Sequence, residues 1–495
     1  MGECSSGEHG APAQLACAAA VAAALEPGRR KFLASALASA GLLTLPPPLA
    51  WAAPTLTVAN VTGLYSVTVA KIVVPLTTGD VSDAVRSWPG KIAVGGGRYS
   101  MGGQVAVRAG LHLDMRQMKR LVWLRADQKA VRVQAGMRWR DLQDVLDPLD
   151  LAVKTMQSYA NFTVGGAVSV NAHGRYVGHG PVGNTVRALQ VVLADGSIVE
   201  SSRQENAECF RAAIGGYGAV GVITEVELDL AENVRIERQV VDVPLDRYAA
   251  FFRRQVLGDP DSVLHNADLM PPRFDAPVCV TWRRTDQALT ESERLTPRDK
   301  TYGAEQNVLF ALTELPGSEP LRKSVIRPML LDKPSVQWLN REASLDVAEL
   351  EPRTRRIATY ALEEYFIPER NVLGFARGLA EVLIAHQVVA VNVSIRHSPA
   401  DRVSTLPWAA EDVFSFVLYY KQRTHESARE RVGRWTRELI DLAIANEGRY
   451  YLPYQLHATK AQFERAYPEI ERLRQVKAKL DPGQKFSNEL WAKVL

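Results

Sequence analysis

Short runs of β-branched residues alternate with brief amphipathic stretches between Val58 and about Leu230. Lys71–Pro75 and Lys91–Val94 have the composition of strands. The threonines and the aspartate that open residues 77–88 are helix-capping residue types, so we expect a helix between the two strands. Met101–Val107 is predicted to be a loop that leads into a further strand.

Two hairpins are predicted in the same region. Leu121–Arg125 and Val131–Ala135 are strand-like runs on either side of a polar turn. Leu189–Val199 contains an Asp-Gly pair between two apolar runs, which is typical of a tight hairpin turn.

The pattern changes from about Glu232 to Glu447. The charged, proline-containing residues 283–300 predict an exposed loop. Thr359–Phe366 and Val388–Ile395 are predicted strands, and Glu426–Ala445 carries apolar residues at helical spacing. This mixture favours a second domain of strands and helices.

Length and composition are those of an ordinary globular protein. A chain of 495 residues usually forms more than one domain. The apolar content of 46% and the charged content of 23% are typical of soluble domains. A net charge of +4, without basic runs interleaved with aromatic residues, gives no indication of a nucleic-acid partner.

The first 52 residues have the features of an export signal. Arg29 and Arg30 form a twin-arginine pair, and the apolar run 32–45 follows. Three prolines end that run, and Ala50–Ala52 is a small-x-small cleavage site. A membrane anchor is the alternative, but a span needs about 20 apolar residues and this run is shorter. We expect residues 1–52 to be a signal peptide, and the mature protein to be periplasmic or secreted.

The cysteines predict neither a disulfide framework nor a metal site. Cys4 and Cys17 belong to the predicted signal peptide, which leaves Cys209 and Cys279. The chain has no His-Glu-x-x-His sequence and no paired cysteines at metal-binding spacing.

Three consecutive glycines follow the predicted strand Lys91–Val94, in the sequence Gly95-Gly96-Gly97-Arg98-Tyr99-Ser100. Glycines in such a place allow the backbone to approach a phosphate closely. The dinucleotide fingerprint would need glycine at Ser100, and the nucleotide-triphosphatase loop would need lysine at Gly103. Both of these familiar motifs are therefore excluded.

Two more glycine loops follow at wide spacing, Phe162–Gly174 and Ile214–Thr224. A single glycine cluster is more often a tight turn than a ligand site, but three in this order are more specific. Together they resemble the FAD-binding domain of the vanillyl-alcohol oxidase and para-cresol methylhydroxylase (PCMH) family over Val58–Leu230. The resemblance implies an α+β fold, with a PCMH-type FAD-binding domain and a substrate-binding domain built on an antiparallel sheet flanked by helices.

The resemblance also implies roles for the three loops. The first would bind the pyrophosphate, the second would line the flavin, and the third would contact the adenosine end through the backbone. The implied cofactor-binding residues are Gly95, Gly96, Gly97, Arg98, Tyr99, Ser100, Thr163, Val164, Gly165, Gly166, Asn171, Ala172, His173 and Val222. Many family members link a histidine covalently to the flavin at the position of Tyr99, so we expect non-covalent FAD here.

The export signal and the family pattern together imply four segments. They are the signal peptide 1–52, the FAD-binding domain 53–231, the substrate-binding domain 232–447, and a C-terminal segment 448–495 that returns to the FAD-binding domain.

Three residues in the second half are candidates for the chemistry of hydroxyl oxidation, which needs a hydride acceptor and a group that takes or holds the hydroxyl proton. Arg396 matches an arginine that binds substrate in alditol and aldonolactone oxidases, which this segment resembles. Tyr451 matches a tyrosine of decaprenylphosphoryl-ribose oxidases, and Tyr454 stands where those enzymes keep a lysine. The His-Trp-x-Lys pattern of the sugar-alcohol and lactone oxidases is missing from this chain.

The predicted function is FAD-dependent oxidation of a hydroxyl group on a small polar or sugar-like substrate, with oxygen or another electron acceptor. Arg396 could instead be an ion-pairing arginine, and Tyr454 could be a packed tyrosine. Glu363 and Glu364 are adjacent in a predicted strand, so they face opposite sides and cannot share one substrate. The alternative functions are an exported flavin-binding protein without oxidation activity, and a reductase of the cell-wall enolpyruvyl nucleotide sugar type.

Overall fold

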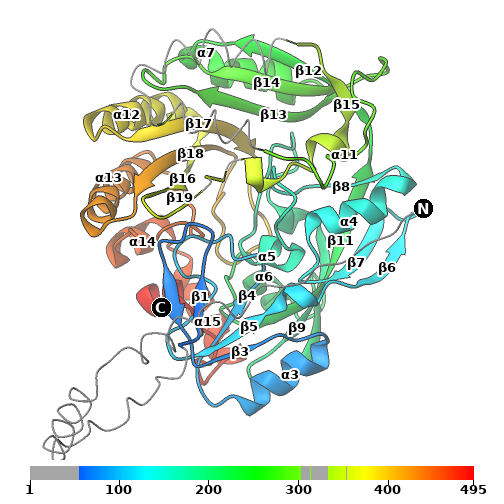
Figure 1. Cartoon of the computed structure of the whole chain (residues 1–495), viewed down its shortest axis with the longest axis vertical. Coiled ribbons are helices and arrows are strands. Elements are labelled where there is room, and N and C mark those ends of the chain that lie inside the picture. Colours follow the sequence, from blue (N-terminus) through cyan, green and yellow to red (C-terminus); the bar gives the residue numbers. More distant parts are fainter. Residues whose placement is uncertain (1–54, 303–312, 314–332, 350, 353) are drawn as a thin grey trace, which may run out of the picture. The chain divides into compact units, whose positions relative to one another are not determined.

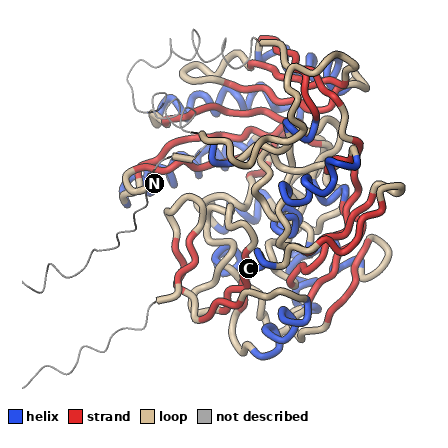
Figure 2. The backbone as a smooth tube through the Cα atoms, turned by 45° about the vertical axis from the view of Figure 1, so that its right-hand side comes forward, coloured by secondary structure: helices blue, strands red, loops and turns tan. Residues whose placement is uncertain are grey.

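The structure, a computed structural model, describes residues 55–302, 313, 333–349, 351–352 and 354–495 (Figure 1). Leu56–Leu495 form one compact unit, to which all that follows refers. The predicted signal peptide lies outside the described residues. Figure 2 shows the strands of this unit in two groups, one in the N-terminal half and one in the C-terminal half.

A small parallel sheet carries the first glycine loop. Its strand order is β3 (Lys71–Val73), β5 (Leu111–Asp114), β4 (Ile92–Gly95). The prediction of a strand at the end of Met101–Val107 is wrong. This segment forms turns, and the next strand begins at Leu111. The turns lie against the C-terminal segment, and Met101 N donates to the carbonyl oxygen of Pro453 at 2.7 Å. A tertiary contact has therefore replaced strand pairing here.

The helix between β3 and β4 begins where the capping residues predict. Helix α3 runs over Thr78–Ser87, and Thr77 is its N-cap. The Thr77 side chain accepts from Asp80 N at 3.1 Å, and the Asp80 carboxylate accepts from Thr77 N at 2.9 Å. This reciprocal capping box satisfies two of the backbone donors that a helix N-terminus leaves free.

An antiparallel sheet forms the rest of the N-terminal half. Its strand order is β10 (Ile198–Ser202), β9 (Val186–Val192), β11 (Val222–Glu232), β7 (Ala130–Gln134), β6 (Leu121–Arg125), and β8 (Leu151–Val153) also pairs with β11. Both predicted hairpins are present as β6–β7 and β9–β10. The helices of this half are α4 (Trp139–Leu146), α5 (Val164–Ser169) and α6 (Ala207–Ala213), and a separate hairpin joins β1 (Thr57–Ala59) to β2 (Ser66–Thr68).

The C-terminal half contains an eight-stranded antiparallel sheet. Its strand order is β15 (Val336–Trp338), β12 (Arg235–Asp242), β14 (Val278–Arg284), β13 (Ser262–Leu269), β17 (Val389–Ser398), β18 (Val413–Arg423), β16 (Ala358–Pro368), β19 (Arg449–Tyr450). The described helices of this sheet region are α7 (Leu245–Phe251), α11 (Leu339–Glu342), α12 (Val372–Ala385) and α13 (Glu426–Ala445). Helices α12 and α13 pack on the sheet, so the predicted α+β fold class is confirmed.

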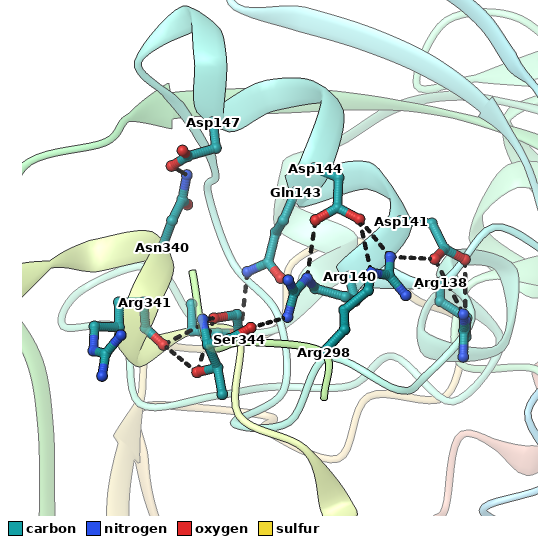
Figure 3. Close-up of polar contacts among 12 residues, drawn as sticks. Arg138, Arg140, Asp141, Gln143, Asp144, Asp147, Arg298, Asn340, Arg341 and Ser344 are labelled. Carbon is teal, nitrogen blue, oxygen red and sulfur yellow. Dashed lines mark hydrogen bonds and ion pairs between the residues drawn. The ribbon is translucent and has the colours of Figure 1, made fainter. Parts of the chain in front are cut away.

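The loop after β14 is fastened to helix α4 by ion pairs (Figure 3). Arg298 Nη2 lies 2.8 Å from Asp141 Oδ1 and also pairs with Asp144. Arg294 Nε lies 2.8 Å from the buried Asp147 carboxylate. Residues 283–300 are therefore largely a loop, as predicted, but this loop is held against the N-terminal half.

The C-terminal segment also packs against the N-terminal half. Its helices are α14 (Lys460–Ala466), α15 (Ile470–Leu480) and α16 (Glu489–Val494). Lys477 Nζ is buried and donates to the Ala219 carbonyl oxygen at 2.7 Å, and Trp491 Nε1 donates to the Gly216 carbonyl oxygen at 3.1 Å. The exact division of the chain into domains stays a prediction.

Candidate active site

A cavity of about 950 Å³ lies where the glycine loops meet the large sheet. The loops around residues 96–100, 162–175 and 217–223 line one part of it. Strands β13, β16, β17 and β18 and the segment 451–454 line the other part. The cavity therefore joins the predicted cofactor loops to the predicted catalytic residues.

The first glycine loop leaves no room for side chains. A β-carbon on Gly96 would stand 2.2 Å from Thr163 Oγ1, which is far inside van der Waals contact. The same Thr163 Oγ1 accepts from Gly97 N at 3.3 Å. Arg98 follows with a φ of 61°, in the left-handed region that few residues other than glycine adopt. The backbone of the first loop thus lies directly against the Thr163 side chain at the edge of the cavity.

Polar contacts behind this loop fix its shape. Arg98 Nη2 lies 3.0 Å from Asp114 Oδ2 and 3.0 Å from His112 Nε2. Burial, helped by the charge of Arg98, lowers the pKa of His112 to about 4. The His112 ring is therefore neutral at physiological pH and can accept from the guanidinium through Nε2.

Tyr99 projects along the cavity wall. Its ring centroid lies 4.6 Å from that of Phe162, and the two rings are tilted by 56°. Burial raises the pKa of Tyr99 to about 12, so its phenol stays neutral. The side chain at the position where the family resemblance implies a flavin-linked histidine is thus a packed aromatic ring.

The second glycine loop forms the short helix α5. Gly165 and Gly166 line the cavity, and Thr163 is the helix N-cap. Asn171, with a φ of 49°, ends this segment behind the cavity wall. Asn171 Oδ1 accepts from Gly183 N at 2.9 Å, and Asn171 Nδ2 donates to Asp401 at 2.8 Å. Asn171 therefore holds the loop in place.

The structure brings ten of the fourteen predicted cofactor residues to the cavity. The lining residues are Gly96, Gly97, Arg98, Tyr99, Ser100, Thr163, Gly165, Gly166, Ala172 and His173. Gly95, Val164, Asn171 and Val222 lie behind the wall. Gly221 and Ile223, on either side of Val222, do line the cavity. Crowded glycines with exposed backbone, next to flat aromatic rings, fit a flavin dinucleotide.

Arg396 points from β17 into the same cavity. Its Nε is buried and has no hydrogen-bond partner among the described residues. Burial lowers the pKa of Arg396, and the charge of Glu364 opposes that shift. A buried donor without a partner is costly, which favours a ligand-binding role over a structural ion pair.

The two predicted tyrosines have different partners. Tyr451 donates to the Val170 carbonyl oxygen at 2.9 Å, which uses its hydroxyl in packing the C-terminal segment on the second loop. Tyr454 donates to Glu364 Oε2 at 3.1 Å. Burial and the Glu364 charge raise the pKa of Tyr454, so its phenol stays protonated and can donate. Both tyrosines line the cavity.

Glu364 is a site residue that the sequence reasoning missed. As expected, Glu363 and Glu364 face opposite sides of β16, and Glu364 lines the cavity together with Tyr360 and Leu362. Glu364 Oε1 lies 2.5 Å from His173 Nε2, and both side chains are buried. The sequence did carry one indication of this role. Glu364 lies on the same face of a predicted strand as Tyr360 and Leu362.

A second polar group on the large sheet was also missed. Asn392 Nδ2 and Asn266 Nδ2 each donate to the Asp268 carboxylate at 2.9 Å. Burial raises the pKa of Asp268. These residues and Ser394 line the cavity beside Arg396, and they offer donors and acceptors suited to hydroxyl groups.

Residues 69–202 match the family model of an FAD binding domain. The chain carries an FAD-binding domain. The predicted cofactor is therefore confirmed, and so is the resemblance to PCMH-type flavoproteins, whereas the non-covalent state of FAD stays a prediction.

The chain is also similar to characterised oxidoreductases. L-gulonolactone oxidase of Mus musculus is 24% identical over 445 residues, which cover 85% of this chain and 94% of that protein. Alditol oxidase of a Streptomyces species is 34% identical over 118 residues, or 24% of this chain and 28% of that one. Cytokinin dehydrogenase 2 of Arabidopsis thaliana is 30% identical over 173 residues, 34% of each chain. These similarities confirm the prediction of an FAD-dependent oxidoreductase.

The remaining features concern metals, thiols and membranes. Among the described residues, no three histidine, cysteine or acidic side chains are grouped as metal ligands would be. Cys209 and Cys279 are both buried free thiols. Within the same part of the chain, no helix combines the length and the apolar character needed to cross a membrane.

Proposed function

We propose that the protein oxidises a hydroxyl group of a small polar or sugar-like substrate. The observation that carries the proposal is the unpartnered Nε of Arg396, buried in the cavity that the FAD loops also line. When bound, FAD supplies the acceptor for the hydride that leaves the substrate carbon. The names of the L-gulonolactone and alditol oxidases support a polyhydroxylated substrate.

The chain's own side chains would hold the reacting oxygen. Arg396 can donate to that oxygen and stabilise negative charge that develops on it. Tyr454 can hydrogen-bond the same hydroxyl through its phenol. Asp268, Asn392 and Ser394 lie beside Arg396 and can bind further hydroxyl groups, which orients the substrate carbon toward the flavin loops.

An anaerobic screen tests this function. Polyols, aldonolactones and sugars are mixed with the purified FAD-loaded protein, and the flavin absorbance is followed. Bleaching by a hydroxyl compound supports the proposal, and its rate after oxygen is admitted tells whether oxygen is the acceptor. A flavin that stays oxidised with every compound would contradict the proposal and favour a flavin-binding protein without oxidation activity.

We further propose export by the twin-arginine route, based on Arg29, Arg30 and the small residues before Ala53. That route carries folded proteins, which suits a cofactor inserted before export. The test replaces both arginines by lysine and measures the protein in periplasmic and cytoplasmic fractions. Retention of an FAD-loaded precursor is the expected result, and unchanged export would refute the assignment.

A further inference from the structure

We propose that Glu364 is the proton acceptor of the reaction, reached through Tyr454 and positioned by His173. The inference rests on the proposed hydroxyl oxidation and assigns the group that receives the substrate proton. The sequence offered Tyr454 as a candidate for holding that proton, and the hydrogen bond of Tyr454 leads on to the Glu364 carboxylate.

The two Glu364 oxygens have one partner each. Oε1 lies 2.5 Å from His173 Nε2, and Oε2 accepts from the Tyr454 hydroxyl at 3.1 Å. The Glu364 side chain is 2% exposed and that of His173 is 4% exposed. Tyr454 lines the cavity, so it links the buried carboxylate to the position of a substrate hydroxyl.

The surroundings of this pair make a purely structural role costly. The His173 ring centroid lies 4.8 Å from that of Trp408 and 5.7 Å from that of Phe366, so the pair is enclosed by aromatic rings. Taking a carboxylate out of water costs several kcal/mol, and a glutamine could fill the same space without that charge. A carboxylate buried beside a cavity that contains Arg396 is typical of groups that exchange a proton.

The proposed step takes one proton and one hydride from the substrate. The substrate O–H proton passes to the Tyr454 oxygen while Tyr454 passes its own proton to Glu364 Oε2. The C–H bond breaks with both of its electrons, which leave as hydride to bound FAD, and a C=O bond forms. The Glu364–His173 pair gains one proton, and Arg396 holds the oxygen throughout.

His173 acts by holding Glu364. It belongs to the second glycine loop, whereas Glu364 belongs to β16, so the pair connects the cofactor loops to the large sheet. Without His173, Glu364 Oε1 loses its partner and the carboxylate can turn away from Tyr454. The titratable and charged groups that face Glu364 are His173, Tyr451, Tyr454 and Arg396, with Tyr217 and Tyr467 further away.

The chain offers a matched control for the test. Glu363 precedes Glu364 in the same strand, is 4% exposed, and lies on the opposite face, outside the cavity. Glu364→Gln and Glu363→Gln therefore make the same substitution in equally buried places, although burial raises the pKa of Glu363 well above its usual value. Anaerobic flavin reduction is measured in both variants by stopped flow between pH 5 and 9, with FAD content as a check on folding.

General base catalysis contributes about 10²- to 10⁴-fold, so Glu364→Gln should slow flavin reduction by about 100-fold or more. The pH profile of flavin reduction should also differ between this variant and the wild type. Glu363→Gln should keep both the rate and the pH profile of the wild type. His173→Asn should slow reduction when made alone, but should add less than about twofold on the Glu364→Gln background.

A second measurement tests the His173–Glu364 contact without any catalytic turnover. In the FAD-free protein, the Nε2 proton shared by His173 and Glu364 should give a downfield proton NMR signal. Both Glu364→Gln and His173→Asn should remove this signal, and Glu363→Gln should retain it.

Wild-type rate and pH profile in Glu364→Gln would overturn the proposal while leaving the proposed function intact. Failure of the wild type to be reduced by any hydroxyl compound would instead be failure of the proposed function. If Glu364→Gln does not fold, Glu364→Asp decides, because it keeps the carboxylate and should retain a measurable rate and the pH profile of the wild type. A pH-independent rate in a folded Glu364→Asp, or an unchanged NMR signal in His173→Asn, would refute the assignment.

Discussion

Gly96 and Thr163 approach so closely that a β-carbon on the glycine would stand 2.2 Å from the threonine hydroxyl oxygen. The two residues belong to different glycine loops, 67 positions apart in the chain. Their contact brings the first loop onto the start of helix α5, at the edge of the cavity. The glycine is therefore required by packing, in addition to any approach of the cofactor.

Gly96→Ala should lower FAD affinity by at least about tenfold, because the loops must separate to admit the methyl group. Fluorescence titration of the FAD-free protein measures the change. Gly483→Ala is the control, since a β-carbon at Gly483 would meet no atom within 4 Å. Adding Thr163→Ala to Gly96→Ala removes the colliding oxygen and should restore part of the affinity. Equal affinity in wild type and Gly96→Ala would show that the loops tolerate separation.

FAD should leave the protein when it is denatured. Tyr99 stands where relatives carry the flavin-linked histidine, and its ring packs on Phe162. Acid precipitation followed by centrifugation should leave the yellow colour in the supernatant. Colour that stays in the pellet would mean that a covalent bond exists and would refute the prediction made from Tyr99.

Asp147→Asn should lower the free energy of unfolding by about 3 kcal/mol, because an amide nitrogen would replace one of the oxygens that accept from two buried asparagines and the partly exposed Arg294. The carboxylate accepts from Asn233 and Asn340 at 2.9 Å each and from Arg294 at 2.8 Å. Asp150→Asn is the control, since that side chain is 74% exposed and should contribute less than about 1 kcal/mol. Urea unfolding measures the free energy of unfolding of the two variants. Similar decreases in both would contradict the conclusion that Asp147 holds the loop after β14 in place.

Acid should destabilise the protein partly through His112. Burial and Arg98 lower the pKa of His112 from 6.5 to about 4, so the unfolded chain binds a proton between these values that the folded chain does not. Stability therefore falls as the pH falls from 6.5 toward 4. Between pH 7 and 5, the wild type should lose about 2 kcal/mol more than His112→Gln in urea unfolding. Equal losses in both proteins would contradict a neutral, buried His112.

Local patterns predicted much of the fold. Helix α13 occupies the predicted residues Glu426–Ala445, and the capping residues before α3 placed its start. The hairpins β6–β7 and β9–β10 of the N-terminal half were predicted from their turns. The error at Met101–Val107 has a tertiary cause, because that segment bonds to Pro453, about 350 residues later in the chain.

The candidate site was only partly predictable for a similar reason. The glycine loops and Arg396 stand out by residue type and by resemblance. Glu364 does not, because strand alternation separates it from Glu363 but gives no indication that His173 and Tyr454 will meet its two oxygens. Such a cluster is assembled from three distant segments, and only the structure brings them together.

Flavin reduction in Arg396→Ala tests the central claim most directly, once a reducing substrate is known. A charged hydrogen bond is worth about 1.5–3 kcal/mol, so the variant should reduce its flavin about 10- to 100-fold more slowly than the wild type, with normal FAD content. Tyr454→Phe should slow flavin reduction by at least about tenfold, because it removes the hydrogen bond to the reacting hydroxyl and the path from that hydroxyl to Glu364. Wild-type reduction rates in both variants would contradict hydroxyl oxidation at this site.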